Sequence, residues 1–290
     1  MVIGIIVDVM SRDARENLFD NIDANDHVTN KDNEGFMTFI TLSTFNYLLI
    51  AWLAVGLTAF VYLFFQTAPY GKHVSTGWGP EISAKAGWII EECPAFFLML
   101  IFFVVAGDYT NPVHVIFTVL YCGHYFNRSF IWPMRAQSTN KKMPLMVVFS
   151  AIGFNFVNVF FQGTWIFLLS DYSSGWLTTI PFLLGLLVFF SGFYINVRSD
   201  EIMINLRKEK GEGYHIPEGF LFNKVSNPNY LGEFIEWLGW AIMTFSWAGL
   251  VFFLWTVCNL FPRAISNHKW YQAKFEDYPK DRKAVIPNII

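Results

Sequence analysis

Charged residues are scarce in this chain, because Asp, Glu, Lys and Arg together account for 15% of its 290 residues. Soluble globular domains carry about a quarter, so the composition argues against a soluble domain. The formal net charge is −3 at pH 7, and no run of basic residues offsets it. The chain is therefore not expected to bind nucleic acid.

Cysteine and the common catalytic motifs are also lacking. The three cysteines, Cys93, Cys122 and Cys258, lie in apolar stretches and form neither a CxxC pair nor a disulfide framework. The six histidines are scattered without the spacing of metal ligands, so we expect no metal site. No GxGxxG, Walker or GxSxG motif occurs, which leaves a Rossmann domain or a serine hydrolase without support. The opening MVIGIIVDVM does not have the pattern expected of a secretory signal.

Hydrophobic residues, by contrast, make up 54% of the chain, and aromatic residues make up 19%. A transmembrane helix needs about 20 mostly apolar residues. Seven stretches meet or approach this length: 39–65, 87–107, 112–132, 145–169, 176–197, 230–245 and 247–262. We predict an all-α integral membrane protein, with a polar N-terminal segment at 1–36 and a domain of seven transmembrane helices at 37–290.

Basic residues alternate between the loops that join these stretches. They occur in the first, third and fifth loops and in the tail, namely Lys72, Lys85, Arg135, Lys141, Lys142, Arg198, Arg207, Lys208, Lys210, Lys224, Arg263, Lys269, Lys274, Lys280, Arg282 and Lys283. The second and fourth loops, AGDYTNP and DYSSG, have none. Because cytoplasmic loops carry an excess of Lys and Arg, this pattern predicts an N-terminus outside and a C-terminus in the cytoplasm.

This orientation brings polar residues from five helices to one level, in the cytoplasmic half of the membrane. They are Glu91, Glu92, His124, Tyr125, Asn127, Arg128, Asn196, Arg198, Asp200, Asn229, Glu233, Glu236, Asn259 and Arg263. Ionisable residues inside a membrane usually face the bundle interior and mark a site. For Glu92, Tyr125 and Glu233 we favour a shared cavity. For Arg198 and Arg263, snorkelling to the interface is an equally good explanation.

Two carboxylates stand side by side in WIIEECPAF. Because neighbours on a helix point about 100° apart, Glu91 and Glu92 are not expected to face the same point. One should serve the cavity and the other the headgroup region, and the periodicity does not say which. A carboxyl group and the Tyr125 phenol meeting at one point would both donate hydrogen bonds to a substrate carbonyl. We interpret His124 as a satisfied interior residue rather than a ligand.

The chain from about residue 69 to its end resembles the steroid 5α-reductase family, the membrane 3-oxo-5α-steroid 4-dehydrogenases, and we expect a bacterial-type homologue. The matching pieces are PYGKH (69–73), WIIEECPAF (88–96), GHYFNRSFI (123–131), FQGTW (161–165), INVRSDEIMINLRK (195–208), YHIPEGFLF (214–222), VSNPNYLGEFIEWLGW (225–240) and HKWYQAKFEDYPKDRKAVIP (268–287). The NPNYLGEFIEW and C-terminal pieces are the most specific. Residues 1–36 have no recognisable counterpart.

The resemblance implies a seven-helix fold and NADPH-dependent reduction of the C4–C5 double bond of a 3-oxo-Δ4-steroid. Glu92 and Tyr125 match the pair that holds the steroid carbonyl, which selects Glu92 over Glu91. The positions that match NADPH contacts are Lys72, Arg128, Lys141, Asn196, Asp200, Arg207, Tyr214, Asn229, Glu233, Arg263, His268 and Tyr271. A two-residue insertion lies near Lys141, and His215 and Asn267 depart from the family pattern. We expect the steroid pocket to be lined by Trp88, Phe154, Glu236, Trp237, Trp255 and Asn259.

Related activities on the same architecture are the alternatives. An enoyl-thioester or polyprenol reductase would keep NADPH and change the pocket. An isoprenylcysteine-type methyltransferase would use S-adenosylmethionine and would not need the pair of Glu92 and Tyr125. A non-enzymatic lipid-binding or transport protein should show helix breaks or an internal repeat, and neither is present. We expect a monomer in a bacterial inner membrane or the endoplasmic reticulum, with a steroid or sterol-like substrate and a cytoplasmic cofactor site.

Overall fold

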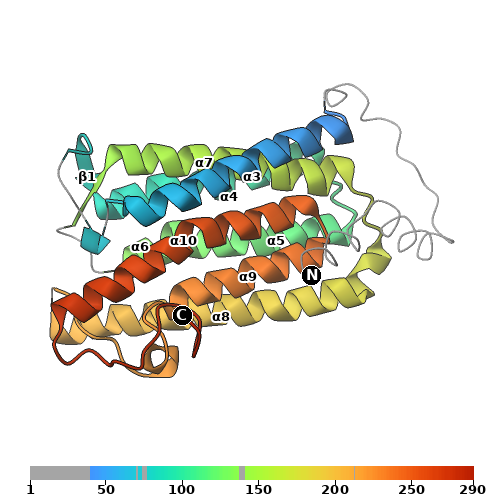
Figure 1. Ribbon diagram of the computed structural model, residues 1–290. Helices are drawn as coiled ribbons and strands as arrows, with labels where there is room; N and C mark the ends of the chain where they lie inside the picture. Colours follow the sequence, from blue (N-terminus) through green and yellow to red (C-terminus); the bar gives the residue numbers. More distant parts are fainter. Residues whose placement is uncertain (1–39, 70, 74–76, 137–140, 212) are drawn as a thin grey trace.

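The structure is a computed structural model that describes residues 40–69, 71–73, 77–136, 141–211 and 213–290. The predicted polar segment 1–36 lies outside these residues. The described part is mostly helical, and its long helices lie side by side in one bundle (Figure 1). A short antiparallel sheet of β1 (Glu81–Ser83) and β2 (Lys142–Pro144) lies at the left end of the bundle in that view.

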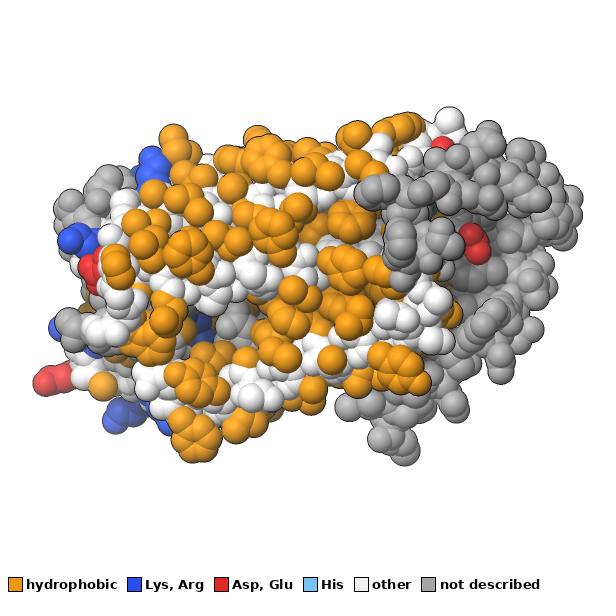
Figure 2. Space-filling view, turned by 90° about the horizontal axis from the view of Figure 1, so that it is seen from above, with side chains coloured by type: hydrophobic (Ala, Val, Ile, Leu, Met, Phe, Trp, Pro, Cys, Tyr) orange, Lys and Arg blue, Asp and Glu red, His pale blue; other side chains and the backbone are white. Residues whose placement is uncertain are grey.

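Five helices of the described part are long and apolar enough to cross a membrane. They are α3 (Leu42–Phe65), α4 (Ala84–Ala106), α7 (Leu145–Thr164) with its π-helical end η4 (Trp165–Leu169), α8 (Ile180–Lys210) and α10 (Trp247–Lys274). Large apolar side chains on these helices are exposed, and they cover the face shown in Figure 2. The chain therefore has helices typical of a multi-pass membrane protein, with five candidate spans among the described residues where the sequence predicts seven.

The other two predicted spans are shorter helices. One is α5 (Pro112–Phe126), continued by the π-helical turn η3 (Asn127–Ile131) and by α6 (Trp132–Arg135). The other is α9 (Pro228–Thr244). It ends at Phe245, which has a left-handed backbone (φ 45°), and the Ser246 hydroxyl then accepts the Gly249 N–H at 2.9 Å and caps α10.

Two helices extend well past their predicted ends. We predicted the fifth span to end at residue 197 and the seventh at 262, where hydropathy falls. In the structure α8 continues to Lys210, where Gly211 (φ 80°) ends it, and α10 continues past Pro262 to Lys274. Falling hydropathy marks where a helix leaves the lipid, but polar residues continue a helix until a residue such as glycine stops it.

Helices α8 and α9 pack closely along their length because glycines face one another in the contact. A Cβ atom on Gly232 would lie 2.5 Å from the backbone nitrogen of Asn196, and one on Gly239 would meet the backbone of Phe189. Glycine lets two backbones approach in this way. The approach sets the polar end of α8, with Asn196 and Asp200, directly against the start of α9, with Asn229 and Glu233.

The short connections η2 (Gly71–His73) and η6 (Phe220–Asn223) lie between these long elements, and η5 (Ser174–Thr178) precedes α8. The main core joins α3, α4, α5, α7, α8, α9 and α10, with Tyr121, Trp176 and Trp240 fully buried. On the face shown in Figure 2, the Lys and Arg side chains gather at one end of the molecule.

Candidate active site

A cavity of about 440 Å³ lies between α3, α4, α5, α7, α9 and α10. Trp88, Phe154, Trp237, Trp255 and Asn259, all predicted for the substrate pocket, line it. Tyr62, Val147 and Phe252 add apolar wall, so most of the lining suits a lipid-like ligand. Glu236 does not line the cavity, because its fully buried side chain turns to His124 instead.

Both carboxylates of the WIIEECPAF stretch line this cavity, contrary to the expectation that one faces the headgroups. The Glu91 residue is only 4% exposed, and its Oε2 is buried without a hydrogen-bond partner among the described residues. Its backbone carbonyl accepts a hydrogen bond from Asn155 Nδ2 at 2.6 Å. Because α4 packs on both α5 and α7, it presents a broad face to the cavity, and two positions 100° apart both fit on that face.

Tyr125, a residue of α5, also lines this cavity. Its ring packs against the rings of Tyr121 and Trp237, with centroid distances of 4.8 and 6.1 Å. These contacts leave the side chain 4% exposed and restrict its rotation. Glu92 and Tyr125 are thus polar groups from two helices in one mainly apolar chamber.

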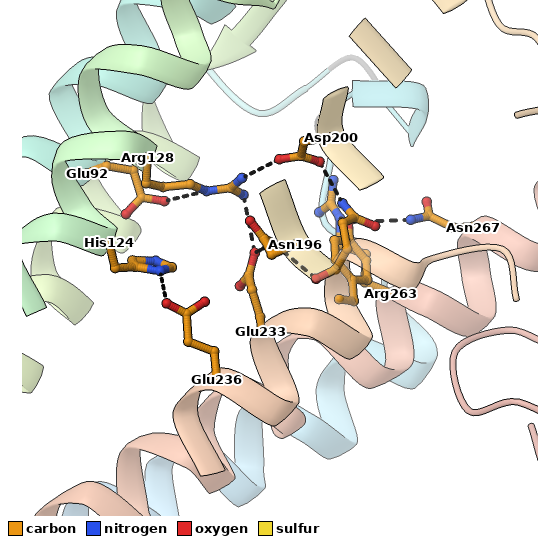
Figure 3. Close-up of polar contacts among 11 residues, drawn as sticks. Glu92, His124, Arg128, Asn196, Asp200, Glu233, Glu236, Arg263 and Asn267 are labelled. Atoms are coloured by element: carbon orange, nitrogen blue, oxygen red, sulfur yellow. Dashed lines mark hydrogen bonds and ion pairs between the residues drawn. The ribbon is translucent and has the colours of Figure 1, made fainter. Parts of the chain in front are cut away.

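Arg128 connects three acidic residues from three helices (Figure 3). Its Nε lies 3.7 Å from Glu92 Oε1, its Nη1 lies 3.4 Å from Asp200 Oδ2, and its Nη2 lies 3.7 Å from Glu233 Oε1. The guanidinium lies against the rings of Trp88 and Trp132, at 4.9 and 5.0 Å from their centres, and the two rings pack edge to face on each other. Arg128 sits in the π-helical turn η3, a local widening of a helix that often occurs at functional sites.

A second cavity, of about 180 Å³, opens on the other side of Arg128. Nine of the positions predicted for the cofactor line it: Lys72, Arg128, Lys141, Asp200, Arg207, Tyr214, Asn229, Arg263 and Tyr271. The two cavities share Trp88, Arg128 and Leu260 as lining residues. The smaller cavity is rich in cations and the larger one is mostly apolar.

The remaining three predicted cofactor residues lie beside this cavity. Asn196 Nδ2 donates to the Asn229 carbonyl at 3.1 Å and to Glu233 Oε1 at 3.2 Å. Glu233 lines the larger cavity, where it faces Arg128. His268 does not line the smaller cavity, but its Nδ1 lies 2.6 Å from Oγ of Ser226, a lining residue. These residues hold lining residues in place rather than forming the surface of the smaller cavity.

The smaller cavity suits a ligand with several negative charges. Burial, and then the neighbouring charges of Arg263, Arg207 and Lys141, lower the pKa of Lys72 to about 7. Lys72 Nζ lies 4.1 Å from the centre of the Tyr271 ring, and Lys141 Nζ lies 4.3 Å from that of Tyr214. Crowded cations of this kind are stabilised by an anion such as a phosphate group, which arginine binds through its planar fork.

The sequence did not single out several residues of the two walls. Trp132 follows Arg128 by four positions, a spacing that places both on one helix face and was a usable signal. Asn227 donates to the Ala264 and Ala284 carbonyls, a role that requires the folded tail and carries no sequence signature. Asn267, which departs from the family pattern, lines the smaller cavity and contacts Asn227 and His73.

Comparison with known proteins identifies the family of this chain. A family model described as 3-oxo-5-alpha-steroid 4-dehydrogenase matches residues 141–290. Steroid 5-alpha-reductase DET2 of Solanum lycopersicum is 44% identical over 247 residues, which cover 84% of this chain and 96% of the relative. The protein named 3-oxo-5-alpha-steroid 4-dehydrogenase 2 of Homo sapiens is 35% identical over 244 residues, covering 81% and 93%.

A bovine relative, 3-oxo-5-alpha-steroid 4-dehydrogenase 1 of Bos taurus, is 36% identical over 241 residues and covers 82% of this chain and 93% of its own. These relatives come from a plant and from mammals, so they give no support to a bacterial type. The resemblance predicted from the sequence motifs is confirmed. The chain belongs to the steroid 5α-reductase (3-oxo-5-alpha-steroid 4-dehydrogenase) family and is an oxidoreductase that acts on CH–CH bonds.

Proposed function

We propose that the protein uses NADPH to reduce the C4–C5 double bond of 3-oxo-Δ4-steroids, with Glu92 and Tyr125 binding the steroid carbonyl. One observation carries this proposal. An apolar chamber containing a carboxyl and a phenol adjoins a cation-rich chamber, and Arg128 and Trp88 line both. A hydrophobic substrate and an anionic cofactor would thus meet at a shared wall.

The smaller cavity would hold NADPH, and the donor set fits that cofactor. Lys72, Lys141, Arg207 and Arg263 would neutralise its phosphate groups, and Tyr214 and Tyr271 offer ring faces and hydroxyl groups beside them. Arg128 lies on the side of the smaller cavity that leads to the larger one. It contacts Asp200, which accepts a hydrogen bond from Asn229, and Asn196 in turn donates to the Asn229 carbonyl. When bound, NADPH would supply the hydride for the reduction.

Glu92 and Tyr125 would act on the substrate carbonyl. Negative charge develops on that oxygen as the double bond is reduced, and hydrogen bonds from the Tyr125 hydroxyl and the Glu92 carboxyl would stabilise it. Arg128 lies 3.7 Å from Glu92 and keeps its side chain at the junction of the two cavities. Trp88, Phe154, Trp237, Trp255 and Asn259 would orient the steroid and exclude water.

The same proposal includes seven spans, with the N-terminus outside and the C-terminus in the cytoplasm. The continuous helical segment 112–135 is about 36 Å long at 1.5 Å per residue, enough to cross a hydrocarbon core of about 30 Å. Helix α9 would cross the membrane with its polar first turns packed against other helices rather than facing lipid. The smaller cavity would then face the cytoplasm, whether the membrane is a bacterial inner membrane or the endoplasmic reticulum. One chain supplies the lining of both cavities, so a monomer would be sufficient for activity.

The decisive experiment is an assay of detergent-purified protein with NADPH and a 3-oxo-Δ4-steroid, followed by loss of nicotinamide absorbance and by mass spectrometry of the steroid. We expect the 5α-reduced ketone as the product. Glu92→Gln should lower kcat by about 10²-fold or more, while the NADPH dissociation constant stays unchanged. Glu201→Gln is the matched control, since that carboxylate lies at the surface beside Arg135. Steroid turnover that is absent, or equal in all three proteins, would refute the proposal.

A further inference from the structure

His124 and Glu236 form a buried hydrogen-bonded pair that the proposed carbonyl chemistry does not use. His124 Nδ1 lies 2.7 Å from Glu236 Oε1, and the side chains are 7% and 0% exposed. The two residues come from α5 and α9, far apart in sequence, and Figure 3 shows the pair beside the contacts of Arg128. Burying two ionisable groups together is costly, so the pair calls for a functional explanation.

The geometry directs one edge of the imidazole into the larger cavity. His124 lines that cavity, whereas Glu236 stands behind it. The two nitrogens of an imidazole point in nearly opposite directions, so a ring whose Nδ1 faces Glu236 turns its Nε2 toward the cavity. The ring cannot rotate freely, because it packs edge to face on Trp237 (centroid distance 4.6 Å) and on Tyr125 (5.1 Å).

Glu236 also affects the protonation of the His124 imidazole, in addition to its orientation. Its second oxygen, Oε2, is buried without a hydrogen-bond partner among the described residues. An unpartnered carboxylate oxygen is tolerated in such a place only if a neighbouring positive charge offsets it. The imidazole is the group in direct contact with this carboxylate, so the arrangement favours a ring that carries a proton on both nitrogens. A carboxylate behind a histidine sets the tautomer and orientation in the same way at other sites.

We propose that His124, oriented by Glu236, is the catalytic residue that donates the proton taken up by C4 of the steroid. This inference rests on the proposed function. It assigns separate tasks to the polar groups of the larger cavity: Glu92 and Tyr125 bind the carbonyl oxygen, and the imidazole protonates carbon. The neighbouring Tyr125 ring is in contact with that of His124, which places the donor next to the carbonyl clamp.

The step balances without any further reactant. C5 receives the hydride, the C4–C5 electron pair moves to form a C3–C4 double bond, and the carbonyl pair moves onto the oxygen to give an enolate. The enolate pair then forms a C–H bond at C4 with the Nε2 proton, and the carbonyl is restored. Nε2 keeps the electron pair of its broken N–H bond, the imidazole becomes neutral, and Nδ1 still donates to Glu236. A proton from water returns the ring to its starting state.

Microscopic reversibility gives a test that does not depend on reduction. The saturated 3-oxo-5α-steroid is incubated in D₂O with the full-length protein and NADP⁺, so that no NADPH is present and exchange at C4 is followed without net reduction. The clamp should then promote removal of a C4 proton by His124 and its replacement by deuterium, which mass spectrometry detects. We expect exchange at C4, rather than at C2, by the wild-type protein.

Three variants decide the assignment. His124→Gln should lose at least about 10²-fold of the exchange rate, the usual size of a general acid–base contribution, and Glu236→Gln should lose part of it. His114→Gln is the matched control, because His114 is also buried on α5 but lies outside the cavity. Steroid and NADPH dissociation constants, measured on each variant, report whether the site is intact. Should His124→Gln fail to fold, His124→Gly with and without added imidazole replaces it, and rescue by imidazole is the expected result.

The outcomes separate the two proposals. Wild-type protein that reduces the enone but exchanges C4 no faster than His124→Gln refutes the role of His124 and leaves the proposed function standing. Absence of wild-type exchange, with the steroid bound, refutes it in the same way. Protein that fails to reduce the enone at all overturns the proposed function and this inference together.

Discussion

The guanidinium carbon of Arg128 lies 4.9 Å from the centre of the Trp88 ring, and these two residues are part of the wall between the two cavities. Trp132 also contacts this guanidinium, at 5.0 Å, and its ring packs edge to face on that of Trp88 at a centroid distance of 5.1 Å. Stacking on aromatic faces leaves the edge of the guanidinium free to meet three carboxylates. Arg128 is therefore the charged residue of the wall that separates a lipid-like compartment from an anion-binding one.

Replacing this arginine should destabilise the protein more than losing a surface ion pair would. Arg128→Ala leaves Glu92, Asp200 and Glu233 without their shared cation, and breaking a buried pair costs about 3–5 kcal/mol. Arg135→Ala is the control, because the partly exposed pair of Arg135 and Glu201 should contribute at most about 1 kcal/mol. Thermal unfolding in detergent measures both, and equal losses would contradict the central role of Arg128.

Cofactor affinity should depend on pH through Lys72. Its pKa is lowered to about 7 by burial first and by Arg263, Arg207 and Lys141 next. A bound phosphate favours the charged amine, so above pH 7 binding takes up a proton, and the NADPH dissociation constant should rise from pH 7 to pH 8 by about fivefold. Below pH 7 the amine is already charged and this contribution levels off.

The control is a residue that stays charged at the same place. Lys72→Arg should flatten this part of the pH dependence, since a guanidinium does not lose its proton in this range. Lys274→Arg, at an exposed position at the end of α10, should leave it unchanged. Titrations of NADPH binding between pH 6 and 8 supply the slopes, and an identical slope in Lys72→Arg would remove Lys72 from the cofactor site.

The glycine contact between α8 and α9 should be needed for the site as well as for stability. Gly232→Ala places a Cβ atom 2.5 Å from the backbone nitrogen of Asn196, and such overpacking costs about 1–3 kcal/mol. The shift should also weaken NADPH binding, because Asn229 and Glu233 flank Gly232. Gly153→Ala on α7, with no atom within 4 Å of the new Cβ, should instead stabilise the helix by about 0.5–1 kcal/mol. Equal unfolding temperatures in the two variants would contradict this account.

The sequence predicted which residues share a level, but not which way each one turns. Alternating basic loops brought Glu92, Tyr125 and Arg128 to the same depth, and the structure does bring them to one cavity. Their spacing of three in the sequence predicts that Glu233 and Glu236 lie on one helix face. That spacing still leaves about 60° between them, which is enough for Glu233 to meet Arg128 while Glu236 meets His124.

Other features depended on contacts that no local pattern contains. The smaller cavity lies where α8 approaches α9, a contact that depends on glycines, and the tail returns to the start of α9, where Asn227 donates to the Ala284 carbonyl. Glu91 could not be placed from periodicity, since the width of the α4 face toward the cavity depends on how α5 and α7 pack against it. Family resemblance supplied residue roles, and geometry was needed to separate lining from supporting residues.

Two tyrosines one helical turn apart offer the sharpest test of the carbonyl clamp. Tyr125 lines the larger cavity, whereas Tyr121 does not, and its hydroxyl accepts a hydrogen bond from Asn158 Nδ2 at 3.1 Å. Tyr125→Phe should lower kcat by about 10²–10³-fold, the loss typical of one oxyanion donor, with little change in stability. Tyr121→Phe should leave kcat within a few-fold of wild type but cost about 1–3 kcal/mol, because a buried amide loses its acceptor.

Turnover and thermal unfolding, measured side by side on both variants, distinguish chemistry from packing. The rings of Tyr121 and Tyr125 are in contact, at a centroid distance of 4.8 Å, so either substitution perturbs the same aromatic cluster. If packing alone mattered, the two variants would lose similar amounts of activity. A loss of kcat confined to Tyr125→Phe, together with a loss of stability confined to Tyr121→Phe, would show that the cavity-facing hydroxyl acts on the substrate.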